Sequence, residues 1–267
     1  MDPPVELMAG LDGELLERIV RRLKELEREL VAVVVFGSFA RGTADEDSDI
    51  DVRAITRSEP SVPYRTWFEE RRGSKPLHVS AGVETARRWM ARKSAPQRWA
   101  LGFPVLHEAR VAWATTAARE LLGDPPSFVH PPGTPEVEDF VEFLTKARRA
   151  SAEGDTAGVR IFARAAAELA PGLLQPLNEK AVVATRRQAL EAALSLEVAP
   201  EHYRDDLTIS LGLVAADDDA VISAALRLGR ELLAFLRERK PDVDPTPDVT
   251  SYLADGTLER HLGFTTD

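Results

Sequence analysis

The chain has 267 residues and a formal net charge of −10, with 44% hydrophobic and 29% charged residues. This composition is ordinary for a globular protein with one large or two small domains. The acidic balance argues against a broad nucleic-acid-binding surface, which needs a basic face, so nucleic acid is not expected as a partner. The absence of cysteine excludes disulfide bonds and thiolate metal sites.

The N-terminal residues 1–4 show no basic segment followed by an apolar stretch, so we expect no signal peptide. No apolar run approaches about 18 residues, the length that crosses a bilayer, so we also expect no contact with the membrane. Together these features predict a cytoplasmic protein.

The first 125 residues alternate between helix and strand signals. Leucine and isoleucine recur at helical spacing between Leu15 and Leu30, which predicts an amphipathic helix over 13–29. Val31–Phe36 is almost entirely β-branched or aromatic and predicts a buried strand. The further predicted elements, in chain order, are a strand over 49–55, a helix over 63–72, a strand over 76–81, a helix over 85–93, a strand over 103–107 and a helix over 115–122.

A change of composition follows. Residues 123–135 contain five prolines and two glycines, which end regular structure and predict a domain boundary. We therefore predict an α+β protein. A first domain, residues 1–125, holds a mixed sheet flanked by helices. A linker, residues 126–135, leads to an all-helical bundle over 136–240.

The bundle is predicted from alanine- and leucine-rich helical segments, which begin at about residue 136 and continue over 155–170, 176–197, 201–214 and 218–239. The C-terminal tail, residues 241–267, starts with a polar, proline-rich stretch. From that stretch we expect the tail to be docked loosely or disordered.

Two neighbouring segments carry the chemistry. The apolar run Val31–Phe36 leads directly into Gly37-Ser38, and Ser48-Asp49-Ile50-Asp51 opens the next strand. Because side chains alternate along a strand, Asp49 and Asp51 are expected on one face, opposite the core-facing Ile50. Two carboxylates so close together repel each other unless a cation lies between them. Mg²⁺ takes oxygen ligands and shares them with substrate phosphates, so this pair predicts a magnesium site.

The glycine-serine turn predicts a phosphate-binding site. A strand that ends in Gly37-Ser38 and opens a short helix leaves backbone N–H groups free to bind phosphate. The Ser38 hydroxyl is a further donor, and Arg41, one turn along the helix, can reach a phosphate oxygen as a fork-shaped donor. Ser48 is placed with the nucleotide-binding residues, with a second role as a hydroxyl cap that ends the loop and orients Asp49.

These residues resemble the signature of the nucleotidyltransferase superfamily of DNA polymerase beta: Gly-Ser, three residues, Gly, then Asp-x-Asp on the next strand. Here the signature is Gly37-Ser38, Gly42 and Asp49-Ile50-Asp51. The spelling is most similar to antibiotic nucleotidyltransferases of the kanamycin and lincosamide type and to minimal nucleotidyltransferases. The segment 173–179, LLQPLNE, also resembles the helical domain of the kanamycin-type enzymes.

The resemblance implies that Asp49 and Asp51 hold Mg²⁺ against an NTP, with ATP the first choice. A nucleoside monophosphate would then pass to a hydroxyl of a small-molecule acceptor lying over the carboxylate face, with an antibiotic as one candidate acceptor. Two metal ions would serve the in-line displacement, one on the triphosphate and one on the acceptor oxygen. A homodimer is left open.

One feature departs from the family. Members carry a third carboxylate on a later strand, but the strand predicted over 76–81 places His78 and Ser80 on the site face, with no acid. We predict that His78 replaces the carboxylate, as a base or as a metal contact. Glu84 is a second candidate, and Glu138 or Glu142 of the helical domain a third.

Other functions remain open at this stage. Minimal nucleotidyltransferases of toxin–antitoxin pairs adenylylate a protein partner, but they are about half as long as this chain. Polymerase or tRNA-end-adding activity is disfavoured by the acidic balance. A degenerate nucleotide-binding or interaction protein is the non-enzyme alternative, and the missing third acid is its support.

Overall fold

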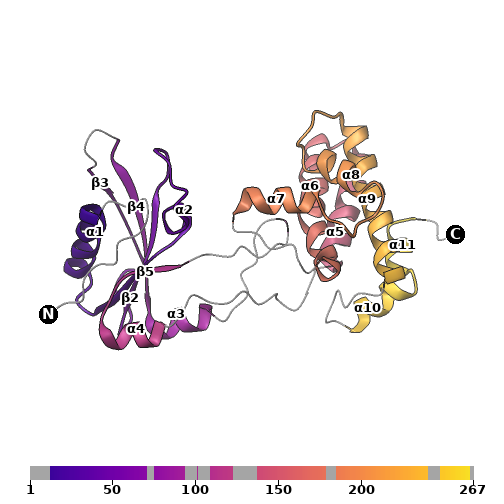
Figure 1. Ribbon diagram of the computed structural model, residues 1–267. Coiled ribbons are helices and arrows are strands. Elements are labelled where there is room, and N and C mark those ends of the chain that lie inside the picture. The colour runs from indigo at the N-terminus through magenta and orange to yellow at the C-terminus, as the bar shows by residue number, and fades with distance from the viewer. Residues whose placement is uncertain are drawn as a thin grey trace. The chain divides into compact units, whose positions relative to one another are not determined.

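The computed structural model describes residues 13–70, 75–93, 101, 109–122, 137–178, 185–239 and 247–264. These residues form two compact units. The first comprises Met1–Ala95 and His107–Phe128, and the second comprises Pro96–Leu106 and Val129–Asp267. Figure 1 shows strands in the first unit and helices throughout the second.

The first unit is built on a five-stranded sheet. Its strands are β1 (Leu30–Val35), β2 (Ile50–Thr56), β3 (Tyr64–Glu69), β4 (Leu77–Thr85) and β5 (Arg110–Ala114). Their spatial order is β3-β4-β2-β1-β5, with β2 and β4 parallel and the other pairs antiparallel. The expected mixed sheet is therefore confirmed.

Helices pack on both faces of this sheet. On one face, α1 (Gly13–Leu26) buries a stripe of Leu16, Ile19 and Leu23 in a core shared with the inward side chains of β1, β2 and β4. On the other face, α3 (Ala86–Lys93) and α4 (Thr116–Leu122) cover Val34 of β1 and other residues near it (Figure 1). The short helix α2 (Gly37–Arg41) follows β1 directly.

A helix was predicted over 63–72, but the structure has strand β3 there, so this prediction is wrong. The inward side chains of β3 are Arg65, Trp67 and Glu69, so no apolar period of two marks the strand in the sequence. The polar ones are held by ion pairs under α1, with Arg65 2.8 Å from Glu27. Four of the six residues, Tyr64-Arg-Thr-Trp-Phe-Glu69, are aromatic or β-branched, and this was the available signal.

Strand β5 was not predicted. The strand expected over 103–107 lies outside the described residues. The other predicted strands are present with shifted ends, since β4 extends four residues beyond the predicted 76–81.

The second unit is helical and has its own core. Its helices are α5 (Val137–Glu153), α6 (Thr156–Leu174), the 3₁₀ turn η2 (Gln175–Leu177), α7 (Arg186–Leu194), α8 (Tyr203–Ser210) and α9 (Asp218–Arg239). Small residues allow close helix contacts. A Cβ atom at Gly229 of α9 would lie 2.4 Å from the Leu144 side chain of α5. In the described part of the chain, no helix is both long and apolar enough to cross a bilayer.

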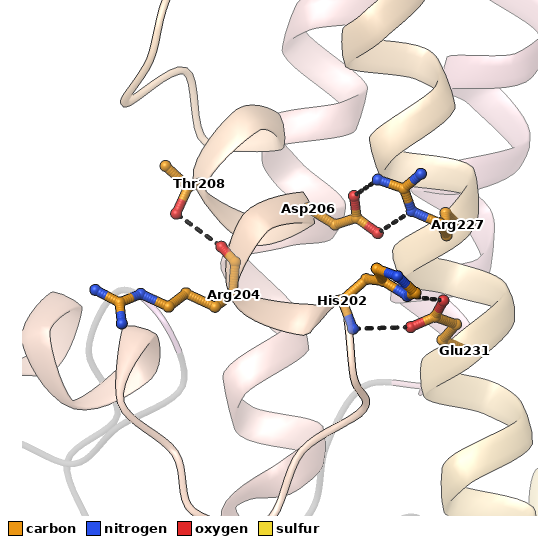
Figure 2. A network of polar contacts seen from close by, with 6 residues as sticks. All are labelled: His202, Arg204, Asp206, Thr208, Arg227 and Glu231. Carbon is orange, nitrogen blue, oxygen red and sulfur yellow. Dashed lines mark hydrogen bonds and ion pairs between the residues drawn. The ribbon is translucent and has the colours of Figure 1, made fainter.

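Polar contacts join α8 to α9 in this unit (Figure 2). Asp206 has no exposed surface, and its carboxylate accepts two hydrogen bonds from Arg227, from Nε at 2.8 Å and from Nη2 at 2.5 Å. Next to this pair, the His202 ring lies 2.7 Å from Glu231, which also accepts from the His202 backbone N–H. The buried acid is thus satisfied in full by a bidentate partner.

The C-terminal segment also belongs to this core. It contains two helices, α10 (Pro247–Ala254) and α11 (Thr257–His261), and buries Leu253 of α10 and Leu262 and Phe264 after α11 against this core. The described part of the tail, 247–264, is therefore packed on the bundle, and the expectation that it is docked loosely or disordered is wrong for it. The sequence signal was the apolar spacing of four, as between Leu258 and Leu262, which the proline-rich start of the tail obscured.

Candidate functional site

The two predicted carboxylates lie together at the start of β2. Ile50 and Val52 are buried, whereas Asp51 between them is exposed. Asp49 precedes the strand, and its side chain is 56% exposed. The alternation expected from the sequence is therefore observed, with both carboxylates on the face opposite the α1 core.

The glycine turn lies beside this pair. Gly37 has φ of +66°, a conformation that favours glycine. A Cβ atom built there would lie 3.6 Å from Oδ2 of Asp51, so the backbone of the turn is adjacent to the carboxylate. The N–H of Phe36 donates to the carbonyl oxygen of Asp51 at 2.9 Å and fixes the start of the turn against β2.

Arg41 ends α2, one turn after Gly37. Arg41 is half-buried, and no hydrogen bond or ion pair joins its guanidinium to another of the described residues. An arginine near the turn without a protein carboxylate is suited to bind an anion from solution.

Ser48 is engaged within its own loop. Its hydroxyl donates to the Asp45 carboxylate at 2.8 Å and accepts from the Asp45 backbone N–H at 2.9 Å. The Asp47 N–H donates to the same carboxylate at 3.1 Å. These bonds, that of the Ser48 hydroxyl foremost, lower the pKa of Asp45. The geometry matches the capping role expected for Ser48.

His78 faces the carboxylate pair from β4. The register pairs Asp51 with Ser80, which puts His78 two residues before Ser80 on the same face. Its Nδ1 atom lies 3.8 Å from Oδ2 of Asp49, beyond hydrogen-bond distance. Its Nε2 atom is hydrogen-bonded to Oγ1 of Thr66 on β3 at 2.6 Å. The strand alternation predicted for His78 and Ser80 is observed.

The alternative acid on this strand, Glu84, lies four residues beyond Ser80, about 13 Å along the strand. Its carboxylate is buried and lies 3.5 Å from Nε of Arg53. Both its distance from the Asp pair and its ion pair argue against a role as third acid. Glu138 and Glu142 lie on α5 of the second unit.

Across the described residues, no group of three or more His, Asp or Glu side chains is arranged to hold a metal ion. Within this described part of the chain, Asp49 and Asp51 lie together with His78 near them. Mg²⁺ shares its ligands with substrate phosphates and water, which can complete its coordination.

The sequence analysis did not identify the part of this face that β3 contributes. Tyr64, Thr66 and Phe68 of β3 point to the same side as His78 and Ser80, because the register pairs Thr66 with Ser80 and Phe68 with His78. Phe68 is 67% exposed and Tyr64 50%. They were missed because this segment was predicted to be a helix, in which they would not share a face.

Comparison with known protein families assigns both units. Residues 16–95 match the model of the nucleotidyltransferase domain, and residues 136–237 match the model of the nucleotidyltransferase substrate binding domain. The chain carries a nucleotidyltransferase domain followed by a nucleotidyltransferase substrate-binding domain. The resemblance inferred from the Gly-Ser and Asp-x-Asp motifs is confirmed, and these matches support an enzyme that transfers nucleotidyl groups.

Other comparisons add little to this assignment. A solved nucleotidyltransferase-like protein from Exiguobacterium sibiricum 255-15 aligns with 93% of this chain and 89% of its own, at 14% identity and a TM-score of 0.40. A comparison with curated proteins gave no match. The assignment rests on the two family models.

Proposed function

We propose that this nucleotidyltransferase domain transfers a nucleoside monophosphate from an NTP to a hydroxyl of a small-molecule acceptor, with Mg²⁺ as cofactor. One observation carries the proposal: two exposed carboxylates, Asp49 and Asp51, lie on one sheet face beside the Gly37 turn. A sheet that only needed to fold would gain nothing from two like charges so close together.

The carboxylate pair fits a hard divalent cation. Asp49 and Asp51 supply oxygen ligands, which Mg²⁺ prefers, and their exposure leaves room for phosphate oxygens and water. When bound, the metal would neutralise negative charge on the triphosphate during an in-line displacement.

The phosphates would bind on the β1 side of this pair. Gly37 allows the backbone to approach a phosphate closely, and Ser38 and Arg41 would donate hydrogen bonds to its oxygens. Ser48 would support nucleotide binding indirectly, because its hydroxyl hydrogen bonds hold the loop before Asp49 in place. ATP is the expected donor because the motif resembles enzymes that use it.

His78 would take the place of the third acid. Its Nδ1 atom is directed toward Asp49, while Thr66 holds Nε2, so the ring is oriented rather than free. His78→Ala should lower the turnover rate, and His78→Asp, which restores a carboxylate, should retain more activity than His78→Ala. Equal turnover in the parent and His78→Ala would exclude this role. The melting temperatures of both variants serve as the control for folding.

The substrate-binding family match suggests that the second unit helps to bind the acceptor. We propose the boundaries 1–125, 126–135 and 136–240 for the domains and their linker. The described C-terminal helices pack in the same core as the bundle, so we propose that they belong to the second domain.

The decisive experiment is a transfer assay. The purified protein is incubated with each NTP in turn, with and without Mg²⁺, and with a pool of hydroxylated small molecules. We expect an acceptor whose mass increases by one nucleotidyl group, which is a nucleoside monophosphate less one water, together with release of pyrophosphate, only when Mg²⁺ is present. A mass increase on protein instead of a small molecule would replace the proposed acceptor class, and no transfer with any NTP would refute the proposal.

A further inference from the structure

We infer that the exposed face of β3 and β4 next to the carboxylate pair binds the acceptor, and that the acceptor presents an uncharged, hydroxylated ring to it. This inference rests on the proposed function and adds the chemical class of the substrate. The surface, which we term the ring platform, consists of Tyr64, Thr66, Phe68, His78 and Ser80.

The ring platform is continuous with the carboxylates. Ser80 pairs with Asp51 in the β2–β4 register, and Thr66 pairs with Ser80 in the β3–β4 register. Three neighbouring strands therefore carry Asp51, Ser80 and Thr66 in one row. Since neighbouring strands lie about 4.8 Å apart, the row extends about 10 Å from the carboxylates, the size of a small ring system.

The direction of the reaction favours this side for the acceptor. In an in-line displacement, the attacking oxygen and the leaving pyrophosphate lie on opposite sides of the phosphorus. The Gly37 turn lies beside Asp51 on the β1 side, so the leaving phosphates are expected there. The attacking hydroxyl must then approach from the β4 side, where the ring platform begins.

The platform combines an aromatic surface with oriented polar groups. The ring of Phe68 lies 5.2 Å from that of His78 and is mostly exposed. The Tyr64 hydroxyl is hydrogen-bonded to Ser80 at 2.5 Å, and Thr66 to His78 at 2.6 Å. Exposed aromatic rings next to a few fixed hydroxyl groups are typical of sites that bind a ring by its face and its hydroxyls by hydrogen bonds.

The charges of the platform disfavour a cationic acceptor. None of its five side chains is an acid, and the acid farther along β4, Glu84, is buried and ion-paired with Arg53. The carboxylates Asp49 and Asp51 are assigned to the metal. An amino group placed over the platform would lose water without gaining a carboxylate partner, whereas a hydroxyl would find Ser80, Thr66 and Tyr64.

The test measures the binding of two pools of ring compounds to the nucleotide-free protein by saturation-transfer difference NMR. One pool contains neutral rings, such as myo-inositol, methyl glucosides and nucleosides, and the other contains amino rings, such as 2-deoxystreptamine and glucosamine. We expect the neutral pool to bind and its signals to fall in Phe68→Ala, with an affinity loss of about tenfold. Tyr64→Phe, which removes only a hydroxyl, should lose less.

Leu26→Ala is the matched control, because Leu26 is an exposed apolar residue of α1 in the same unit and lies away from the platform. It should leave neutral-ring binding unchanged. Binding of the amino pool alone, no binding of the neutral pool, or equal binding by Phe68→Ala and the parent would overturn the inference.

The affinity for ATP shows whether the ring platform binds the acceptor or the nucleobase of ATP. Measured by calorimetry with a non-hydrolysable ATP analogue and Mg²⁺, it should be the same in Phe68→Ala and the parent. Weaker analogue binding in Phe68→Ala would assign the platform to the base and overturn the inference while the proposed function stands. Failure of that function is read separately, as the absence of nucleotide transfer with every NTP.

Discussion

The two units use the same residue types in opposite ways. In the first unit, Asp49 and Asp51 are exposed on a sheet face beside a glycine turn. In the second, Asp206 has no exposed surface, and Arg227 occupies both of its oxygens (Figure 2). An acid that is buried with its ion-pair partner contributes to stability, whereas exposed acids on one sheet face are accessible to a ligand from solution.

The histidines repeat this contrast. His202 lies 2.7 Å from Glu231, which also accepts from the His202 backbone, so this ring is held by one carboxylate at a helix start. His78 lies 3.8 Å from Asp49, too far for a hydrogen bond, with Thr66 on its other nitrogen. The gap at His78 leaves room for a metal or substrate atom to come between the two groups.

The largest effect is expected when the carboxylate pair is broken. Asp49→Asn or Asp51→Asn should reduce Mg²⁺-dependent nucleotide transfer by about three orders of magnitude, because metal stabilisation of the transition state contributes several kcal/mol. The melting temperature of the apo protein should stay the same or rise slightly, since a like-charge repulsion is removed. Transfer kinetics and thermal unfolding measure the two effects.

A matched control comes from the loop before the pair. Asp47 is an exposed acid whose ion pair with Lys75 lies at the surface, so Asp47→Asn should change neither quantity by much. Full activity in both Asp49→Asn and Asp51→Asn would refute the assignment of the site. Loss of activity in Asp47→Asn as well would point to a general effect of charge.

In the second unit, breaking the buried ion pair is expected to lower the stability of the fold, with no direct effect on the carboxylate site of the first unit. Arg227→Met leaves the buried Asp206 carboxylate unpaired and should destabilise the protein by about 3 kcal/mol. Asp206→Asn should cost less, because the side chain of Arg227 is 46% exposed and can turn into solvent. Urea unfolding followed by helical circular dichroism gives both values.

Two controls sharpen this prediction. The double variant Asp206→Leu with Arg227→Met should be more stable than Arg227→Met alone, because no charge remains buried. Arg187→Met breaks an exposed pair with Glu191 and should change the free energy of unfolding by less than about 1 kcal/mol. Equal stability of Arg227→Met and the parent would mean that the buried pair does not act as described.

A smaller effect is expected at the phosphate side of the first unit. Ser38→Ala combined with Arg41→Ala should weaken ATP binding by about tenfold or more, since each charge-assisted hydrogen bond contributes about 1.5–3 kcal/mol. Adenosine, which has no phosphate, should bind both proteins alike. Ser61→Ala with Arg57→Ala, at two exposed positions of the same unit, is the control. An equal loss for adenosine would show that the turn does not bind phosphate.

The parts of the site that could be predicted from the sequence are those set by a local pattern, either strand alternation or a short motif. Strand alternation placed Asp49, Asp51 and His78 on one face, and the Gly-Ser spelling located the turn. Strand β3 was missed because its inward residues Arg65 and Glu69 are polar. They form ion pairs with Glu27, directly after α1, and with Arg18 of α1, and no local pattern reveals such tertiary contacts. With β3 unrecognised, the exposed aromatic residues beside His78 could not be connected with the site.

The C-terminal helices were misjudged for the opposite reason. Local composition, a proline-rich start at 241–247, suggested a loose tail, but buried residues at spacing of four, such as Leu258 and Leu262, join the helical core. Arg237 of α9 also donates to the nearly buried Glu259 at 2.7 Å. Whether a short amphipathic segment docks depends on the surface that it meets, and a single sequence does not describe that surface.

The smallest effect is expected in the loop that leads into Asp49. The Ser48 hydroxyl is the main cause of the lowered pKa of Asp45, with the Asp47 N–H next. Ser48→Ala should therefore raise the pKa of Asp45 part of the way toward its usual value, since the bond from Asp47 remains. Carboxyl chemical shifts followed by NMR over acidic pH report this pKa directly.

The sign of the pH dependence follows from the direction of this shift. A folded-state pKa below the unfolded one means that the ionised Asp45 stabilises the loop above the usual pKa of an aspartate, and that this contribution is lost as the pH falls through the lowered value. Ser48→Ala should reduce the contribution at neutral pH while Asp49 keeps its place directly before β2, so transfer activity should fall only slightly. Ser58→Ala is the control, because the Ser58 hydroxyl bonds to Glu29 and not to Asp45. A loss of activity in Ser48→Ala as large as in Ser38→Ala with Arg41→Ala would instead place the Ser48 hydroxyl on the nucleotide.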